Sequence, residues 1–571
     1  MDFSITPSYS DLFGSVCSDP QSLISDLKSD HVISYLSLIN TQLYMADEED
    51  PEFQKQLLSQ LLFYWLPEVR NEFISSISSF VSKNPNLNFF KSIYIVHFIH
   101  NELINYRIEG KQELTSKDEH RVVKAYFAYI DVFSKNLNVD LTGISPDDRF
   151  VFQKSFWPVV AKQFDFNEKI DPVYQHLRAA IVLEHFYLDK DYRPFVENYL
   201  KIYGKEAIWN LMMDMMAVIM IGLNKRTDGT NIYNFLIRDT PGYTTFLDNF
   251  SIDVEEYKSN KSLQEDFLGI RQKPLLKIGP ETYAVLSWKF LYNSIYLGTL
   301  FDFKNRSGIE SKIDYNRFKS IIGTEVSEKI IFKKLMQYMF QNKHSIIHFD
   351  DDSDNGLTDC YLRIGKYIYL FEFKDNLMPT KVITSNSFDV IKKHIDECFI
   401  RSSTGQKKGI SQLFEQISVL DKGGFTFDNY EDKKIKKRNL VVIPILVTTT
   451  FHYEMPGINS YLAEELNNKI KAHSPDFAFG KIVHLTMIDF GFLYRHFYRI
   501  KKKETDIKKL ILNFHHQLKE SKHPYDRHKS FESSFPKDFR KKAPAQKEEG
   551  FINELFLALN IDPTRTNKNQ S

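Results

Sequence analysis

The chain has 571 residues, of which 42% are hydrophobic and 26% charged, a composition that is typical of folded domains and excludes a largely disordered chain. Its 74 Lys and Arg residues balance its 74 Asp and Glu residues, so any contact with nucleic acid has to come from local basic patches. The three cysteines lie far apart in sequence, which excludes a disulfide scaffold and a multi-cysteine zinc site and favours a reducing, cytoplasmic location.

A chain of this length is too long for one hydrophobic core, and residues 1–255 are predicted to form a separate helical region. Apolar residues recur there at three- and four-residue steps, as on one face of a helix. The stretches are 32–43, 57–81, 90–104 and 122–133. No catalytic motif is found in this region. We expect a scaffold or recognition region that binds a partner protein, a substrate end or a second copy of the chain.

One stretch, Ala207–Leu223, approaches the length of a membrane span but contains Asn210 and Asp214. We interpret it as a buried helix and expect no membrane contact. The N-terminus lacks a basic stretch followed by an apolar one, so no signal peptide is predicted.

Residues 256–320 are predicted to form a mixed linker module, with short strands near 274–276 and 283–286 and a helix at Phe290–Leu300. Residues 321–520 then alternate between helical and strand patterns. The predicted elements are a helix at Glu325–Phe340, strands at Ser345–Phe349 and within Asp359–Lys374, a helix at Ile410–Leu420, strands at Leu440–Val447 and Lys481–Ile488, and a helix at Thr505–Leu518. This order predicts an α/β domain with a mixed central β-sheet flanked by helices, and an α+β fold overall.

Residues 521–571 are predicted to be a polar, partly mobile tail with one short helix at Phe551–Leu559. Within the α/β domain, the stretch Thr358–Asn376 is predicted to be a β-hairpin. Its Gly365-Lys366 pair is a two-residue loop, because Gly tolerates the positive φ that such a turn needs. Counting outward from this loop places Asp359 opposite Glu372.

Strand alternation then sorts the hairpin side chains onto two faces. The apolar face, which we expect in a core, carries Cys360, Leu362, Ile364, Tyr367, Tyr369, Phe371 and Phe373. The second face, which we expect to be open to water, carries Asp359, Tyr361, Arg363, Ile368, Leu370, Glu372 and Lys374.

Two acids directly opposite one another across a strand pair repel, and a divalent cation removes that cost. Mg²⁺ binds one or two carboxylates and keeps several waters. Lys374 points to the same side as Asp359 and Glu372 and can orient or help to deprotonate an attacking water. These residue types at this spacing predict phosphodiester hydrolysis.

The pattern of an Asp followed by Glu-x-Lys on the paired strand resembles the PD-(D/E)XK nuclease superfamily, over about residues 320–500. Thr358 stands where the family name has its proline. The resemblance implies a restriction-endonuclease-like domain in which Asp359 and Glu372 bind Mg²⁺, with Mn²⁺ as a possible substitute, and Lys374 assists the attacking water. The Phe373 carbonyl is a further candidate ligand.

The family also has a Glu on the preceding helix, for which Glu328 is the candidate and Glu325 the alternative. It has a Gln or Lys at the start of the following helix, and Lys408 and Gln412 stand there. The resemblance implies a nuclease acting on DNA rather than RNA, in anti-phage defence, restriction or repair. A catalytically silent nucleic-acid-binding or assembly protein with the same fold, and an RNA-cleaving enzyme, stay open as alternatives.

Two further groups of charges each have two interpretations. An acidic stretch before the hairpin is interpreted as a solvated turn rather than as metal ligands; it holds Asp350, Asp351, Asp352 and Asp354. The basic runs are either phosphate contacts or a solubilising surface; they are Lys433-Lys434, Lys436-Lys437-Arg438, Lys501-Lys502-Lys503 and Lys508-Lys509.

Overall fold

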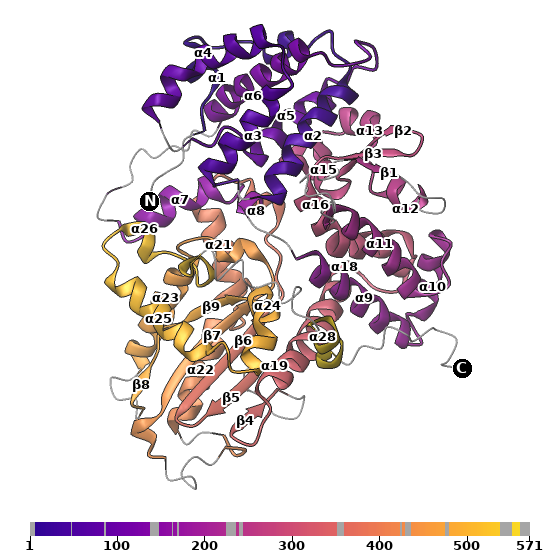
Figure 1. Cartoon of the computed structure of the whole chain (residues 1–571). Coiled ribbons are helices and arrows are strands. Elements are labelled where there is room, and N and C mark those ends of the chain that lie inside the picture. The colour runs from indigo at the N-terminus through magenta and orange to yellow at the C-terminus, as the bar shows by residue number, and fades with distance from the viewer. Residues whose placement is uncertain are drawn as a thin grey trace. The chain divides into compact units, whose positions relative to one another are not determined.

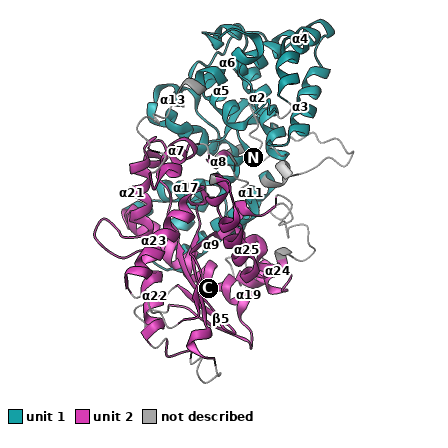
Figure 2. Ribbon diagram, turned by 90° about the vertical axis from the view of Figure 1, so that its left-hand side faces the viewer, with its two compact units in different colours: residues 1–138, 169–310 teal, residues 139–168, 311–571 magenta. Residues whose placement is uncertain are grey.

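The computed structural model describes residues 6–46, 48–84, 87–136, 145, 148–162, 164–167, 171–223, 236–238, 244–350, 359–422, 425–428, 435–473, 479–536 and 551–559. The chain divides into two compact units, coloured separately in Figure 2. Unit 1 contains residues 1–138 and 169–310, and unit 2 contains residues 139–168 and 311–571. Helices dominate the N-terminal half and a mixed sheet lies in the C-terminal half, so the predicted α+β fold class is confirmed.

Unit 1 is built mainly from helices; η marks a 3-10 or π helix. They are α1 (Tyr9–Phe13), η1 (Pro20–Leu23), α2 (Ser29–Met45), α3 (Pro51–Phe63), α4 (Pro67–Lys83), α5 (Ser92–Ile104), α6 (Ser116–Asn136), α9 (Pro172–Leu188), α10 (Arg193–Ile202), α11 (Ile208–Leu223), α12 (Thr244–Asn249), α13 (Val254–Ser259), α14 (Lys261–Gln264), η2 (Glu265–Phe267), α15 (Leu268–Gln272), α16 (Trp288–Asn293), η3 (Ser294–Gly298) and α17 (Thr299–Arg306), with η4 (Ile309–Ser311) at the unit boundary.

The predicted stretch 57–81 is two helices rather than one, because Pro67 begins α4 at the position where a missing N–H costs nothing. The strands predicted within 256–320 are β2 (Leu275–Gly279) and β3 (Thr282–Val285), and both belong to unit 1. They form an antiparallel sheet with β1 (Leu236–Arg238), in the order β1-β3-β2. Among the described residues, no helix is long and apolar enough to cross a membrane, and α11 buries Leu211 and Met215.

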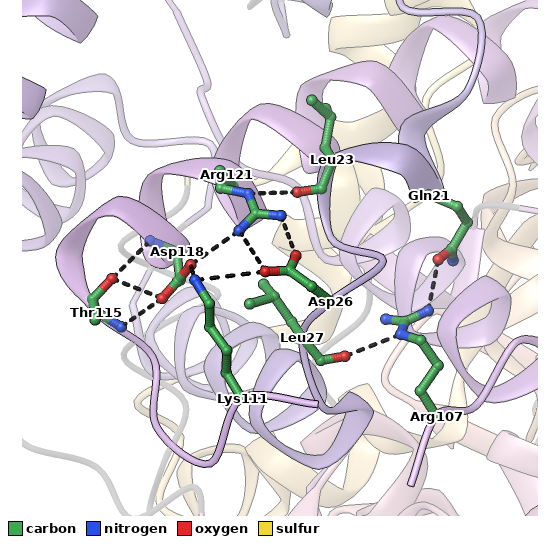
Figure 3. A network of polar contacts seen from close by, with 9 residues as sticks. All are labelled: Gln21, Leu23, Asp26, Leu27, Arg107, Lys111, Thr115, Asp118 and Arg121. Atoms are coloured by element: carbon green, nitrogen blue, oxygen red, sulfur yellow. Dashed lines mark hydrogen bonds and ion pairs between the residues drawn. The ribbon is translucent and has the colours of Figure 1, made fainter. Parts of the chain in front are cut away.

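A network of ion pairs lies near the starts of α2 and α6 in unit 1 (Figure 3). Arg121 pairs with Asp26 and with Asp118, and Lys111 Nζ lies 2.8 Å from Asp118 Oδ1. Thr115 Oγ1 also donates to Asp118, whose side chain is 1% exposed. Because both carboxylates are paired with basic groups, this network joins the loops before α2 and α6 and is structural.

Unit 2 contains the larger sheet (Figure 1). Its strands are β4 (Ser345–His348), β5 (Cys360–Ile364), β6 (Tyr367–Lys374), β7 (Val441–Thr448), β8 (Lys481–Ile482) and β9 (Thr486–Asp489). The order is β4-β5-β6-β7-β8, and β9 also pairs with β7. The pairs β4–β5 and β5–β6 are antiparallel, whereas β7 is parallel to β6, β8 and β9. The single strand predicted at Lys481–Ile488 is therefore two short strands.

The helices of unit 2 cover both faces of this sheet. They are α7 (Val151–Val160), α8 (Phe164–Asn167), α18 (Tyr315–Ser320), η5 (Ile321–Phe332), α19 (Lys333–Phe340), α20 (Thr380–Ile383), α21 (Phe388–Phe399), α22 (Ile410–Lys422), η6 (Lys437–Asn439), η7 (Phe451–Glu454), α23 (Ile458–His473), α24 (Phe490–Lys501), α25 (Ile507–Glu520), α26 (Pro524–Arg527), η8 (Glu532–Ser534) and α28 (Phe551–Leu559). The helix predicted at Glu325–Phe340 begins earlier and is π-helical as far as Phe332. The predicted helix Phe551–Leu559 is confirmed as α28.

The two faces of β6 meet different helices. On one face, the Phe373 ring stacks on Phe332 of η5 at 4.9 Å and meets Phe490 of α24 edge-on at 5.6 Å. On the other, Tyr361, Ile368 and Leu370 belong to a buried cluster with residues of α21, α22 and α23. The expectation that this second face is open to water is therefore wrong, because a central strand covered by helices on both sides buries both faces.

Residues 139–168 belong to unit 2 although they lie within the N-terminal half of the sequence. The Trp157 side chain of α7 is fully buried, and its Nε1 donates to the Pro456 carbonyl at 3.0 Å. Gly457 has a φ of +96°, and a Cβ there would lie 3.1 Å from Trp157 Nε1. Helix α7 is thus an integral part of the core of unit 2.

Candidate active site

The turn of the β5–β6 hairpin sets its register. Gly365 has a φ of +58°, the positive value expected at the first position of a two-residue loop. Ile364 pairs with Tyr367, and pairing continues outward to Cys360 and Phe371. The predicted register is confirmed, and it brings the next residues, Asp359 and Glu372, level with each other.

Asp359 lies just beyond the last pair of the ladder, and its carboxylate is held by the opposite strand. The Phe373 N–H donates to Asp359 Oδ2 at 2.5 Å. The N–H and C=O of one strand residue point toward the same neighbouring strand. The Phe373 carbonyl therefore also faces the Asp359 side of β6, where it was predicted to act.

Glu372 and Lys374 form an ion pair on the face they share with Asp359. Lys374 Nζ lies 2.5 Å from Glu372 Oε1 and 3.8 Å from Asp359 Oδ2. The side chain of Glu372 is 0% exposed, and its Oε2 has no hydrogen-bond partner among the described residues. One ammonium is thus shared by two carboxylates, and half of the more deeply buried one is unsatisfied.

Glu328 on η5 is the helix acid that reaches this group. Burial raises its pKa to about 8, and the charge of Asp359 adds to the shift. The charge of Lys374 opposes this shift, and that of Glu372 adds to it. The alternative, Glu325, is 40% exposed and pairs with Lys329 at 3.3 Å. Of the two acids, Glu328 is the one directed at the candidate site.

Burial raises the pKa of the carboxyl groups of the site, and the charge of Asp359 adds to the shifts of Glu372 and Glu328. Burial raises the pKa of Glu372 to about 8, with Asp359 adding to the shift and Lys374 opposing it. Burial also raises the pKa of Asp359. For Lys374, burial lowers the pKa, but the carboxylates of Glu372 and Asp359 outweigh it and leave the pKa raised. Lys374 therefore stays charged at neutral pH.

The residues present fit a small divalent cation. Among the described residues, no three His, Cys, Asp or Glu side chains converge as a complete metal site. The unpartnered Oε2 of Glu372 lies on the same side as Asp359 and needs a positively charged or donor partner. Mg²⁺ is commonly held by one or two carboxylates, with water completing the shell. Asp359, Glu372 and the Phe373 carbonyl would supply the protein ligands.

The two candidates at the start of the following helix, Lys408 and Gln412, take part in local contacts with the backbone. Gln412 Oε1 accepts from the Gly409 N–H at 2.8 Å, so it caps the start of α22. The Lys408 N–H donates to the Ile400 carbonyl at 3.1 Å. The catalytic role implied for Gln412 stays a prediction.

Of the acidic stretch, Asp350 is exposed and its charge contributes to the raised pKa of Glu372. Asp351, Asp352 and Asp354 lie outside the described residues, as do Lys433 and Lys434 of the basic runs. The interpretations of these residues stay predictions.

Sequence reasoning missed Asp375, which directly follows Lys374. Its Oδ2 accepts from Ser327 Oγ at 2.6 Å, and its Oδ1 accepts from Thr449 Oγ1. The signal available in the sequence was only its place next to the Glu-x-Lys motif. The donors come from η5 and from the end of β7, far away in the chain, so the contacts could not be derived from local pattern.

A buried pair supports the hairpin at its other end. The Arg363 guanidinium makes a two-pronged contact with Asp428, with Nη2 to Oδ1 at 2.7 Å, and Tyr361 Oη donates to the same carboxylate. Arg363 and Asp428 are 3% and 1% exposed. This pair anchors the second face of the ribbon that carries Asp359 and Glu372.

The chain was compared with protein-family models, with curated proteins and with solved structures, and none of them matches it.

Proposed function

We propose that this chain is a metal-dependent nuclease of the PD-(D/E)XK type that hydrolyses phosphodiester bonds, with DNA favoured over RNA. The observation that carries the proposal is the fully buried Glu372, whose Oε2 lacks a partner among the described residues while Asp359 lies level with it across the hairpin. A buried, half-satisfied carboxylate costs free energy unless a cation or donor completes it. A metal-dependent nuclease would hold its catalytic cation with carboxylates placed in this way.

The order of elements in unit 2 supports the same assignment. A helix, three antiparallel strands, further helices and a strand parallel to β6 follow one another. This is the order predicted from the sequence pattern, and it includes the helices before and after the hairpin on which the resemblance implies further site residues. The Glu-x-Lys motif occupies the end of β6, the strand at which the antiparallel and parallel parts of the sheet join.

The chemistry follows from the states of the side chains. A bound Mg²⁺ supplies positive charge that neutralises the charge developing on a phosphoryl oxygen. Because its pKa is raised, Lys374 acts as a donor that orients the attacking water or a phosphate oxygen, and not as a base. Glu328, with a pKa of about 8, is mostly protonated at pH 7, and it can accept a proton from the attacking water once a bound cation has displaced its own.

A cleavage assay on the full chain tests the proposal. Plasmid DNA, linear duplex DNA and single-stranded RNA are incubated with Mg²⁺ or Mn²⁺, using the wild type, Glu372→Gln and Lys374→Met. We expect metal-dependent cleavage of DNA that falls by about 10²–10⁴-fold in both variants. Lys392→Met is the matched control, because Lys392 is also a partly buried lysine paired with an acid, Asp396 at 2.6 Å, and it lies outside the basic runs.

Three results would contradict parts of the proposal. Cleavage by Lys374→Met at the wild-type rate removes Lys374 from the mechanism. Failure of the wild type to cleave any substrate with either metal favours the alternative, a silent nucleic-acid-binding or assembly protein. Preferential cleavage of RNA would reassign the substrate, since the metal chemistry does not depend on the sugar. In this proposal, unit 1 recognises a substrate end, a regulator or a second copy of the chain.

A further inference from the structure

Glu328 lies on η5, and its charge interacts with those of Asp359, Lys374 and Glu372. Its position in the site depends on where the backbone of η5 lies. The helix is tied to the end of β6 next to the motif, because Ser327 Oγ, on the preceding residue, donates to Asp375 Oδ2 at 2.6 Å. Ser327 is 2% exposed, so the donor end of this bond is shielded from water.

A second contact shows how closely η5 approaches this strand end. A Cβ at Gly323, one helical turn before Ser327, would lie 3.7 Å from the Cβ of Asp375. The other carboxylate oxygen of Asp375 accepts from Thr449 Oγ1, just after β7. Asp375 thus joins three elements at one point: η5, the end of β6 and the end of β7.

We propose that Asp375 is a positioning residue that holds Glu328 against the group formed by Asp359, Glu372 and Lys374. The inference rests on the proposed metal-dependent function. Asp375 is not one of the proposed metal ligands; it accepts hydrogen bonds from Ser327 and Thr449. It acts through Ser327, and a loss of either partner lets η5 move relative to β6 and shifts Glu328 away from the cation.

The test measures Mn²⁺ binding to the full chain by titration calorimetry, well below the unfolding temperature of each variant. We expect Ser327→Ala and Asp375→Asn each to weaken binding about tenfold, because Glu328 and its negative charge are no longer held beside the ligand Asp359. Ser327→Thr keeps the hydroxyl and is expected to restore the wild-type affinity. Thr450→Val is the matched control, because its hydroxyl donates to the neighbouring Asn376 carbonyl at 2.7 Å.

A double-mutant cycle separates positioning from general loosening of the fold. In the Glu328→Gln background, we expect Ser327→Ala to change Mn²⁺ affinity by less than twofold, because the carboxylate it positions is gone. An equal loss in both backgrounds overturns the inference, as does an equal loss from Thr450→Val. If the wild type binds no Mn²⁺, the proposed function fails and this inference fails with it. If the wild type binds Mn²⁺ and the Ser327→Ala and Asp375→Asn variants bind it with the same affinity, this inference is overturned while the proposed function stands.

Discussion

Lys374 Nζ lies 2.5 Å from Oε1 of Glu372, while Oε2 of the same carboxylate is buried and has no partner among the described residues. The two side chains are two residues apart on β6 and therefore point to one side of the strand. The pair leaves an unsatisfied acceptor where Asp359 lies opposite. The first two predictions concern the protonation of the acids in this site, Glu372 and Glu328.

Metal-free protein is expected to lose stability as the pH rises. The pKa of Glu328 is about 8 in the folded chain, against an ordinary value of 4.5. Its contribution is intact below pH 4.5 and is lost as the pH rises to about 8, at about 1.4 kcal/mol per pKa unit. Glu328→Gln is expected to make this slope shallower, while Glu372 keeps its own contribution; urea midpoints from pH 5 to 9 with EDTA measure the slope. Parallel slopes for the two proteins would contradict the assignment.

Binding of Mg²⁺ is expected to release protons at pH 7. Glu328 and Glu372, both with a pKa of about 8, carry protons there that a cation displaces. Calorimetry in two buffers with different ionisation enthalpies measures the number released, and affinity is expected to rise with pH up to about 8. A binding enthalpy that is the same in both buffers at pH 7 counts against this.

Trp157→Ala is expected to destabilise unit 2 by about 3–5 kcal/mol, because truncating a fully buried aromatic leaves a cavity. The Trp157 ring lies 5.6 Å from Phe388 of α21, so the loss falls in the core cluster on the second face of the sheet. Chemical unfolding measures the change. Phe63→Ala serves as the control, since Phe63 is 74% exposed and its removal should change little.

Replacing one partner of the buried Arg363–Asp428 pair is expected to cost more stability than replacing both partners. Arg363→Met leaves an uncompensated carboxylate in the core and should destabilise unit 2 by about 3–5 kcal/mol. The double variant Arg363→Met/Asp428→Leu should recover most of that loss, because an apolar pair needs no desolvated charge. A double variant less stable than the single one would show that the pair itself is net stabilising.

The features predictable from sequence are those set by local rules. The Gly365-Lys366 turn and strand alternation were enough to fix the hairpin register and to bring Asp359 level with Glu372. The apolar runs at 440–447 and 551–559 likewise gave β7 and α28. In each case, a pattern of a few neighbouring residues determines the element.

The features missed depend on distant parts of the chain. The second face of the hairpin was expected in water because it carries polar side chains such as Arg363, yet Asp428 pairs with that side chain in the core. The membership of α7 in unit 2 and the contacts of Asp375 likewise join residues over long sequence separations. Local pattern carries no information about which distant segment will cover a face.

The path of the backbone has a consequence for how this protein can be altered. Because residues 139–168 belong to unit 2 while the residues on either side belong to unit 1, the polypeptide passes from one unit to the other three times. Proteolytic nicking at any one of these junctions leaves the two units covalently tethered. Recombination that exchanges the C-terminal half as a single segment cut near residue 311 would leave α7 behind, and the transplanted half would lack Trp157.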